Sequence, residues 1–339
     1  MKKSAFLLPA LAVFTGVASA QSSVNLFGVA DVAVRRVSNG VDPTYSMGSG
    51  GLAASRWGIR AQEDLGGGMA AGAWLEGTVN VDDGSGNSAR FWNRRSTVSL
   101  MGPLGEVRLG HDLTPGYTSF AEFDTFGVSG LADQGKFYST AFGSGIEATG
   151  LWARADNMVS YFTPNSLGGF YANLAVALGE RKPAQKYTGG RVGYATGPVN
   201  VTVAYSVFDG LGGNLTRAAV AGSYDLKVAK FLGSIVRSNY IDASRLVAQV
   251  GVVVPVGQAG NVRANYTRVN ESGTLNGASI NQNHATQIAV GYTYEFSKRT
   301  TLYATLVSLS NAGNAAFGLG TPPAGRLLRG AEFGMSHRF

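Results

Sequence analysis

The last eight residues of the chain alternate strictly between two faces and end on an aromatic side chain. One face carries Phe333, Met335, His337 and Phe339, and the other carries Glu332, Gly334, Ser336 and Arg338. A period of two is typical of a β-strand with one apolar and one polar face. Chain termini fray unless they are tied down, and a strand in a membrane barrel must pair on both edges. We therefore expect this strand to pair with the first strand and close a membrane barrel.

The N-terminal segment has the three parts of a secretory signal. Two lysines come first, residues 5–17 are almost entirely apolar, and residues 18–20 read Ala-Ser-Ala. A basic start, a short apolar core and a small-x-small cleavage pattern are typical of a signal peptide, and this core is too short to span a bilayer as a helix. We expect residues 1–20 to be a cleaved signal peptide and residues 21–339 to form one exported barrel.

Composition beyond this segment excludes a helical membrane protein. The most apolar stretch, residues 250–256, is far shorter than the ~20 residues that a membrane helix needs. Charged residues are only 14% of the chain, which suits a wall with one face in lipid. The chain has no cysteine, so disulfides and thiolate chemistry are excluded. The net charge of +7 comes from dispersed arginines, which disfavours nucleic acid as a partner.

Alternating segments recur along the whole chain and predict an all-β fold, a 16-stranded antiparallel transmembrane β-barrel. The expected strands are residues 24–35, 56–62, 71–80, 91–101, 105–111, 153–163, 169–178, 187–195, 199–207, 215–224, 230–238, 245–254, 262–269, 286–296, 301–309 and 327–339. A soluble β-sandwich would also alternate, but its inward positions would be dry, whereas those of this chain carry Arg, Asn, Gln and Thr.

Several segments resemble the Gram-negative general porin family. They are residues 55–60 with 63–68, 94–100 with 105–110, 157–161 with 163–164 and 168–170, 297–304 and 334–339. These matches are spread over the chain after the signal and are most similar to the strongly basic, anion-selective trimeric porins. The resemblance implies a homotrimer of barrels in the outer membrane, in contact with membrane lipid and lipopolysaccharide. It also implies a third external loop that folds inward and narrows each channel.

The segment expected to form this constriction loop is about 112–152, the longest stretch without clean alternation. Loops of this length in compact folds usually serve a function. Three phenylalanines recur within it at every third position: Phe120, Phe123 and Phe126. This spacing suggests a short helical turn against the inner wall, with Glu122 and Asp124 directed towards water.

Arginine is the candidate selectivity residue. Alternation places Arg56, Arg60 and Arg108 on the inward face, and the resemblance implies that Arg56, Arg94 and Arg154 occupy positions of the constriction cluster. Rings of arginine favour anions, and a guanidinium stays charged at any relevant pH. The alternative for each arginine is a purely structural ion pair with a nearby carboxylate.

Two features would modify this selectivity. His111 stands where many family members carry arginine, so we expect it to line the pore with a titratable charge. The loop carboxylates Glu122 and Asp124 would offset part of the basic wall. The sequence therefore predicts passive diffusion of small hydrophilic solutes and ions with a preference for anions. A channel for one organic acid or phosphate-like anion is the alternative.

Other chemistry has little support in the sequence. The three histidines, His111, His284 and His337, form no pattern typical of a hydrolase, and we expect neither catalysis nor a cofactor. Residues 82–87 lack the spacing of a calcium loop, and no metal site is expected. A surface adhesin or a purely structural barrel also remains open. The tryptophans Trp57, Trp74 and Trp92 are typical of belts at a membrane interface.

Overall fold

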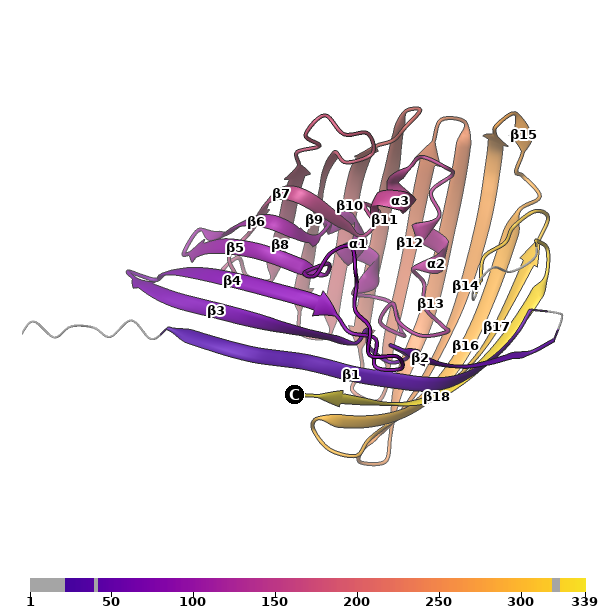
Figure 1. The fold of residues 1–339 in the computed structure, drawn as a ribbon, viewed down its shortest axis with the longest axis horizontal. Coiled ribbons are helices and arrows are strands. Elements are labelled where there is room, and N and C mark those ends of the chain that lie inside the picture. Colours follow the sequence, from indigo (N-terminus) through magenta and orange to yellow (C-terminus); the bar gives the residue numbers. More distant parts are fainter. Residues whose placement is uncertain (1–21, 40–41, 319–323) are drawn as a thin grey trace, which may run out of the picture.

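A computed structural model describes residues 22–39, 42–318 and 324–339, and the predicted signal segment lies outside these ranges. Sixteen of the strands in the described part form one antiparallel ring (Figure 1). In chain order they are β1 (Ser23–Ser38), β3 (Arg56–Gly66), β4 (Met69–Thr78), β5 (Arg95–Gly102), β6 (Gly105–Leu113), β7 (Arg154–Phe162), β8 (Phe170–Ala177), β9 (Tyr187–Thr196), β10 (Val199–Asp209), β11 (Asn214–Asp225), β12 (Lys230–Tyr240), β13 (Ala243–Val256), β14 (Gly260–Leu275), β16 (His284–Glu295), β17 (Thr300–Ala312) and β18 (Leu327–Arg338). No helix in these ranges is long and apolar enough to cross a membrane.

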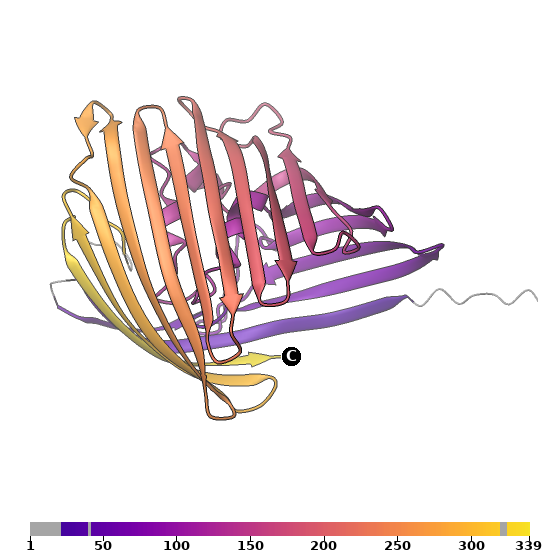
Figure 2. The ribbon, with the colours of Figure 1, turned by 180° about the vertical axis from the view of Figure 1, so that it is seen from behind.

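The ring closes between the first and last strands, as the C-terminal alternation predicts. Strand β18 pairs with β1 from Val29↔Arg338 to Ser38↔Arg329, and the two lie side by side in Figures 1 and 2. The final residue extends this seam, because Gly28 and Phe339 exchange backbone hydrogen bonds of 3.0 and 3.1 Å. Closure therefore leaves no free edge on either terminal strand.

Alternation sorts side chains between the two faces of the wall. Outward residues such as Leu26, Ile235 and Phe333 are exposed, while inward Ser336 and Gln287 are buried within the barrel. The predicted 16-stranded ring and its faces are therefore confirmed.

Two details of the strand prediction are wrong. The fourth strand begins at Arg95 and not at residue 91, because Asn93 turns the chain by binding the backbone N–H and the hydroxyl of Thr78. A short strand, β2 (Thr44–Ser49), also pairs with the far half of β1. A second short strand, β15 (Ala278–Ser279), pairs with the end of β14.

The long segment between β6 and β7 enters the barrel and packs against its inner wall (Figure 1). It carries three short helices: α1 (Pro115–Ala121), α2 (Lys136–Ser139) and α3 (Ile146–Thr149). Helix α1 starts where the Thr114 hydroxyl accepts the N–H of Tyr117 and a proline follows at the first turn. We call residues 114–153 the inward loop.

Aromatic side chains of the inward loop dock it on the wall. Phe120, Phe137 and Tyr138 are almost fully buried in a cluster that includes Val236 and Leu309. Phe123 and Phe126 are buried as well, so the predicted burial of the three phenylalanines is confirmed. The predicted helical turn is only partly right, because α1 ends at Ala121 and Phe123 and Phe126 follow in turns. The loop thus occupies one side of the bore and faces the strands β3–β6 across it.

Candidate functional site

An indole ring supports two arginines on the inner wall of β3–β5. The Arg60 and Arg95 guanidinium carbons lie 3.5 and 4.2 Å from the centroid of Trp74. Such contacts between a cation and an aromatic face are attractive and hold a flexible side chain in place. The Trp74 Nε1–H donates to Glu76 at 3.2 Å, which fixes the ring itself. The ring therefore presents two positive charges to the bore.

Two carboxylates link the next arginines of this wall. Asp112 accepts from Arg95 at 2.7 Å and from Arg108 at 2.6 Å, and Glu106 accepts from Arg108 at 2.8 Å. The Arg108 guanidinium also lies 4.3 Å from the centroid of Phe162. The two arginines of this group are thus balanced by two carboxylates and are held in fixed positions.

Arg56, Arg94 and Arg154 come together near the loop end of the same wall. Glu76 accepts from Arg94 at 2.6 Å and lies 3.5 Å from Arg56. Arg154 donates to the backbone carbonyl of Arg94 at 2.8 Å. The three predicted cluster residues are therefore neighbours, and Glu76 pairs with two of them, Arg56 and Arg94.

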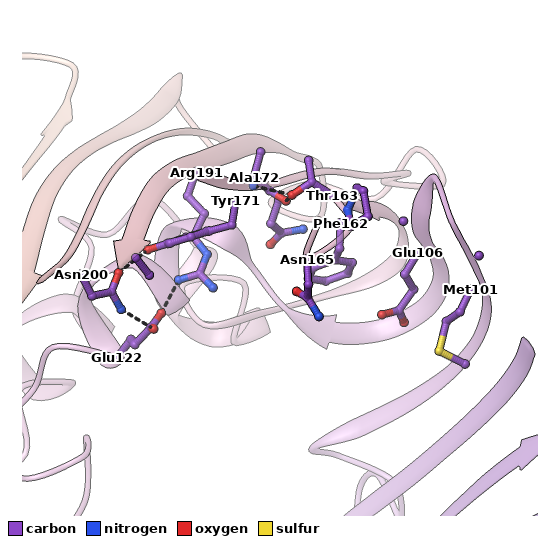
Figure 3. Close-up of a pocket in the computed structure, with 15 residues that line it drawn as sticks. Met101, Glu106, Glu122, Phe162, Thr163, Asn165, Tyr171, Ala172, Arg191 and Asn200 are labelled. Carbon is purple, nitrogen blue, oxygen red and sulfur yellow. Dashed lines mark hydrogen bonds and ion pairs between the residues drawn. The ribbon is translucent and has the colours of Figure 1, made fainter. Parts of the chain in front are cut away.

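Glu122 faces the bore from the end of α1. Its carboxylate accepts from Arg191 at 2.6 Å and from Asn200 at 3.1 Å, and Figure 3 shows both contacts. They border an alcove of about 600 Å³ that also includes Tyr171 and Glu106. The prediction that Glu122 meets water is confirmed, because its side chain is 42% exposed.

Asp124 does not point to water, and that prediction is wrong. Its carboxylate is buried and accepts the backbone N–H groups of Phe126, Val128 and Gln134. Burial raises the pKa of Asp124 to about 7, the nearby Asp133 adds to the rise, and the three N–H donors oppose it. The residue organises the inward loop and does not line the bore.

His111 does not line the bore either. It lies between Gly110 and Asp112 on β6, so its side chain leaves the opposite face from Arg108 and Asp112. There Nδ1 contacts Asp156 at 2.6 Å and Nε2 contacts the Asn93 carbonyl at 3.0 Å. The prediction fails because residue 111 is still part of β6, follows the strand alternation and does not join the loop.

Comparisons with known proteins agree with this geometry. A family model described as Gram-negative porin matches residues 7–314. Outer membrane porin protein 32 of Delftia acidovorans is 36% identical over the whole of both chains. An outer membrane porin protein of Bordetella pertussis is 28% identical over 94% of this chain and 99% of its own. The chain belongs to the Gram-negative porin family.

Solved structures agree with the fold of this porin. The anion-selective porin from Comamonas acidovorans superposes with a TM-score of 0.85 at 34% identity, covering 94% of this chain and 100% of that one. OmpT of Vibrio cholerae superposes with a TM-score of 0.70 at 16% identity, covering 94% and 98%, which supports the fold alone. The predicted family, fold and outer-membrane location are confirmed.

Sequence reasoning missed several residues of the porin wall. Arg95 lies in a resembling segment, and the sequence predicts for it mainly a structural ion pair, which it forms with Asp112. Its contact with Trp74 is not foreseen, and Arg191 carries no expectation. Trp74 was assigned to a membrane belt, which is wrong because its ring lies under Arg60 on the inward face. The sequence pattern does indicate an inward Trp74, because Trp74 and Glu76 lie on the same face of an alternating strand.

Proposed function

We propose that this porin passes small hydrophilic solutes and ions by passive diffusion and prefers anions. The observation that carries the proposal is the charge balance of the β3–β7 wall. Around Trp74 and Glu76, six arginines of this wall stand with the three carboxylates that pair with them: Arg56, Arg60, Arg94, Arg95, Arg108 and Arg154 with Glu76, Glu106 and Asp112. Of the other carboxylates on these strands, Asp156 pairs with Arg90 and contacts His111, and Glu63 and Asp64 lie at the far end of β3. In this part of the chain, Arg60 and Arg154 form no ion pair, and the Arg60 guanidinium stacks on the Trp74 ring.

An excess of fixed positive charge attracts anions into a confined passage. Two unit charges 4 Å apart interact by about 1 kcal/mol in bulk water and by about 4 kcal/mol at an effective dielectric constant near 20. The Comamonas acidovorans protein, an anion-selective porin that is 34% identical to this chain, supports the same preference. Membership of the Gram-negative porin family supports a homotrimer here, surrounded by outer-membrane lipid and lipopolysaccharide.

Reversal potentials across a planar bilayer in a salt gradient test the proposal. Wild-type channels should be anion-selective, and Arg60→Ser or Arg56→Ser should lower the anion-to-cation permeability ratio by a factor of about two to five, the effect of roughly 0.5–1 kcal/mol. Arg237→Ser removes the same charge from the outer face of the wall and serves as the matched control. A cation preference in the wild type, or equal effects of all three substitutions, would contradict the proposal.

One recess favours a second candidate, a channel for a single organic acid or phosphate-like anion. Arg60, Arg108 and Thr97 line this recess, which has a volume of about 200 Å³ beside the Trp74 ring. A dedicated site would saturate, so the chloride current should fall to a plateau as a preferred anion is added. A current that declines equally with every anion of similar size would exclude a dedicated site.

A further inference from the structure

Both ring nitrogens of His111 face oxygen atoms, on the side of β6 that turns away from the bore. Nδ1 lies 2.6 Å from Oδ1 of Asp156, and Nε2 lies 3.0 Å from the backbone carbonyl oxygen of Asn93. The imidazole is only 16% exposed, so the two contacts are largely shielded from water. A neutral imidazole has one N–H and can donate to only one of these oxygens.

The surroundings of Asp156 show which groups carry the protons. The same carboxylate oxygen that contacts His111 also accepts from Arg90 at 2.7 Å. An oxygen that accepts from a guanidinium and an imidazole together belongs to an ionised carboxylate, so Nδ1 of His111 must donate to it. The Asn93 carbonyl is an acceptor only, so Nε2 must donate as well. This geometry therefore requires the doubly protonated imidazolium.

The charges next to this imidazolium come from two elements. Among the described residues, the charged side chains that contact or pair in this network are Asp156 on β7 and Arg90 in the segment before β5. Opposite His111 on β5 lies the neutral Ser96, and the adjacent Asp112 on β6 faces the bore with the arginines that it binds. The network thus lies on the other side of the wall from the bore.

The Asn93 carbonyl nevertheless belongs to the peptide group that leads into the constriction cluster. The same planar group carries the N–H of Arg94, which donates to the backbone carbonyl of Glu76 at 3.1 Å. The Arg94 guanidinium binds the Glu76 carboxylate at 2.6 Å, and the Arg94 carbonyl accepts from Arg154 at 2.8 Å. The orientation of one peptide plane therefore affects two arginines of the cluster.

We propose that His111 positions the selectivity cluster from outside the bore. Its imidazolium holds the Asn93–Arg94 peptide, and this peptide in turn holds Arg154. When the imidazolium gives one proton to water, Nδ1 keeps its proton, because its contact with the ionised Asp156 is the shorter one and is charge-assisted. The lone pair of Nε2 then faces the Asn93 oxygen and repels it. The inference rests on the proposed anion preference, since it concerns the same arginines.

Reversal potentials in a salt gradient, recorded from about pH 5 to about pH 8, test this role, because histidine changes charge in that range. The wild-type anion-to-cation permeability ratio should fall by up to about twofold as the pH rises, since the arginines move but keep their charge. His111→Lys keeps a charged donor and should retain the ratio of low pH throughout, whereas His111→Leu should show the lower ratio throughout. His284→Leu removes another outward histidine and is the matched control, which should behave like the wild type.

Asp156→Asn separates the position of the peptide from the charge of the imidazole. An amide N–H can donate to Nδ1, so a neutral His111 keeps its proton on Nε2 and still holds the Asn93 carbonyl. The permeability ratio should then stay high and lose its dependence on pH. A pH dependence that persists in Asp156→Asn would assign the effect to the field of the imidazolium and overturn the proposal. Because the pKa of Asp124 lies at about 7, a parallel series in Asp124→Asn should retain the dependence on pH.

NMR of the ring nitrogens, in porin labelled only at its three histidines, gives a measurement that does not depend on current. Both nitrogens of His111 should be protonated at about pH 5, and only Nδ1 at about pH 8. Loss of the proton from Nδ1 first would overturn the inference, as would a ratio in His111→Lys that changes with pH like the wild type. A cation preference of the wild type would instead contradict the proposed function, whatever the NMR spectra show.

Discussion

At the scale of single residues, Trp74 sets the geometry of the arginine wall. Long side chains lose much rotamer freedom when they are held in one position, and the indole compensates by attracting both guanidiniums. Without the ring, Arg60 would have no fixed contact among the described residues, while Arg95 would keep Asp112. The ring therefore matters more for Arg60 than for Arg95.

Trp74→Leu should weaken anion preference although it removes no charge. Without the ring, the Arg60 side chain would move among several positions in the bore, but its charge would remain. We therefore expect the anion-to-cation permeability ratio to fall by less than in Arg60→Ser. Reversal potentials measure this, and Trp57→Leu on the outward face is the matched control. A ratio unchanged in Trp74→Leu would show that charge alone, without its placement, sets selectivity.

Asp124 should make the inward loop sensitive to pH. Its pKa is raised to about 7 in the docked loop, so protons bind the docked loop more tightly than a loop open to water. Docking should therefore strengthen as pH falls from about 7 towards about 4, the ordinary carboxyl range. Asp133 and Lys136 on the same loop and Arg263 on the wall act on the same carboxylate.

Single-channel recordings test whether the inward loop docks more strongly at lower pH. Current fluctuations from loop movement should be smaller at about pH 5 than at about pH 8, and Asp124→Asn should flatten that difference. Glu122→Gln, at the open end of α1, should leave it in place. A larger fluctuation at acidic pH, retained in Asp124→Asn, would assign the effect to another group.

At the scale of elements, inner-face side chains hold the inward loop by its backbone. Gln249 donates to the Phe123 carbonyl at 2.6 Å, and Gln287 donates to that of Ala132 at 3.0 Å. Two buried arginines complete the anchorage: Arg217 donates to carbonyls of Tyr138 and Trp152, and Arg245 donates to those of Phe137 and Thr140. Polar residues of the strands thus fix the loop in the bore.

Replacing either buried arginine should lower the free energy of unfolding, and by different amounts. Arg245 also pairs with buried Glu271 at 2.6 Å, so Arg245→Met would leave an uncompensated carboxylate and cost about 3–5 kcal/mol. Arg217 pairs with no carboxylate among the described residues, so Arg217→Met should cost about 1–3 kcal/mol. Trypsin cleavage at Lys136, which is partly buried and donates to the Leu131 carbonyl and to Gln287 in the docked loop, reports loop release. Faster cleavage in Arg217→Met than in Arg245→Met would contradict this order.

Prediction of the strands succeeded because alternation depends only on neighbouring residues along each strand. Alternation found the ring strands, because lipid on one side and water on the other impose the same period on each strand. The prediction failed where the position of a residue depends on contacts with residues far away in the sequence. The burial of Asp124 depends on how the loop turns back to Gln134, and the strand start at Arg95 depends on Asn93 reaching Thr78. The partners of each arginine likewise come from neighbouring strands that spacing alone does not reveal.

At the scale of the whole molecule, two carboxylates join the barrel seam to its loops. Asp31 on β1 accepts the Tyr303 hydroxyl from β17 at 2.6 Å and the backbone N–H groups of residues 51–53. Glu332 on β18 binds Arg35 across the seam at 3.1 Å and accepts the N–H of Leu131 in the inward loop. Closure of the ring and placement of the loop therefore depend on the same few groups.

Tyr303→Phe tests this coupling without disturbing the backbone pairing of β17. The change removes one hydrogen bond to a buried carboxylate, so the free energy of unfolding should fall by about 1.5–3 kcal/mol. Urea unfolding in detergent micelles, followed by tryptophan fluorescence, measures it. Tyr266→Phe on the lipid-facing side of β14 is the matched control and should change stability by less than about 0.5 kcal/mol. Because Asp31 also holds residues 51–53, Tyr303→Phe should loosen that loop as well, which faster amide exchange at those residues would detect. If the two variants unfolded at the same urea concentration, the Asp31 network would not be what secures the seam.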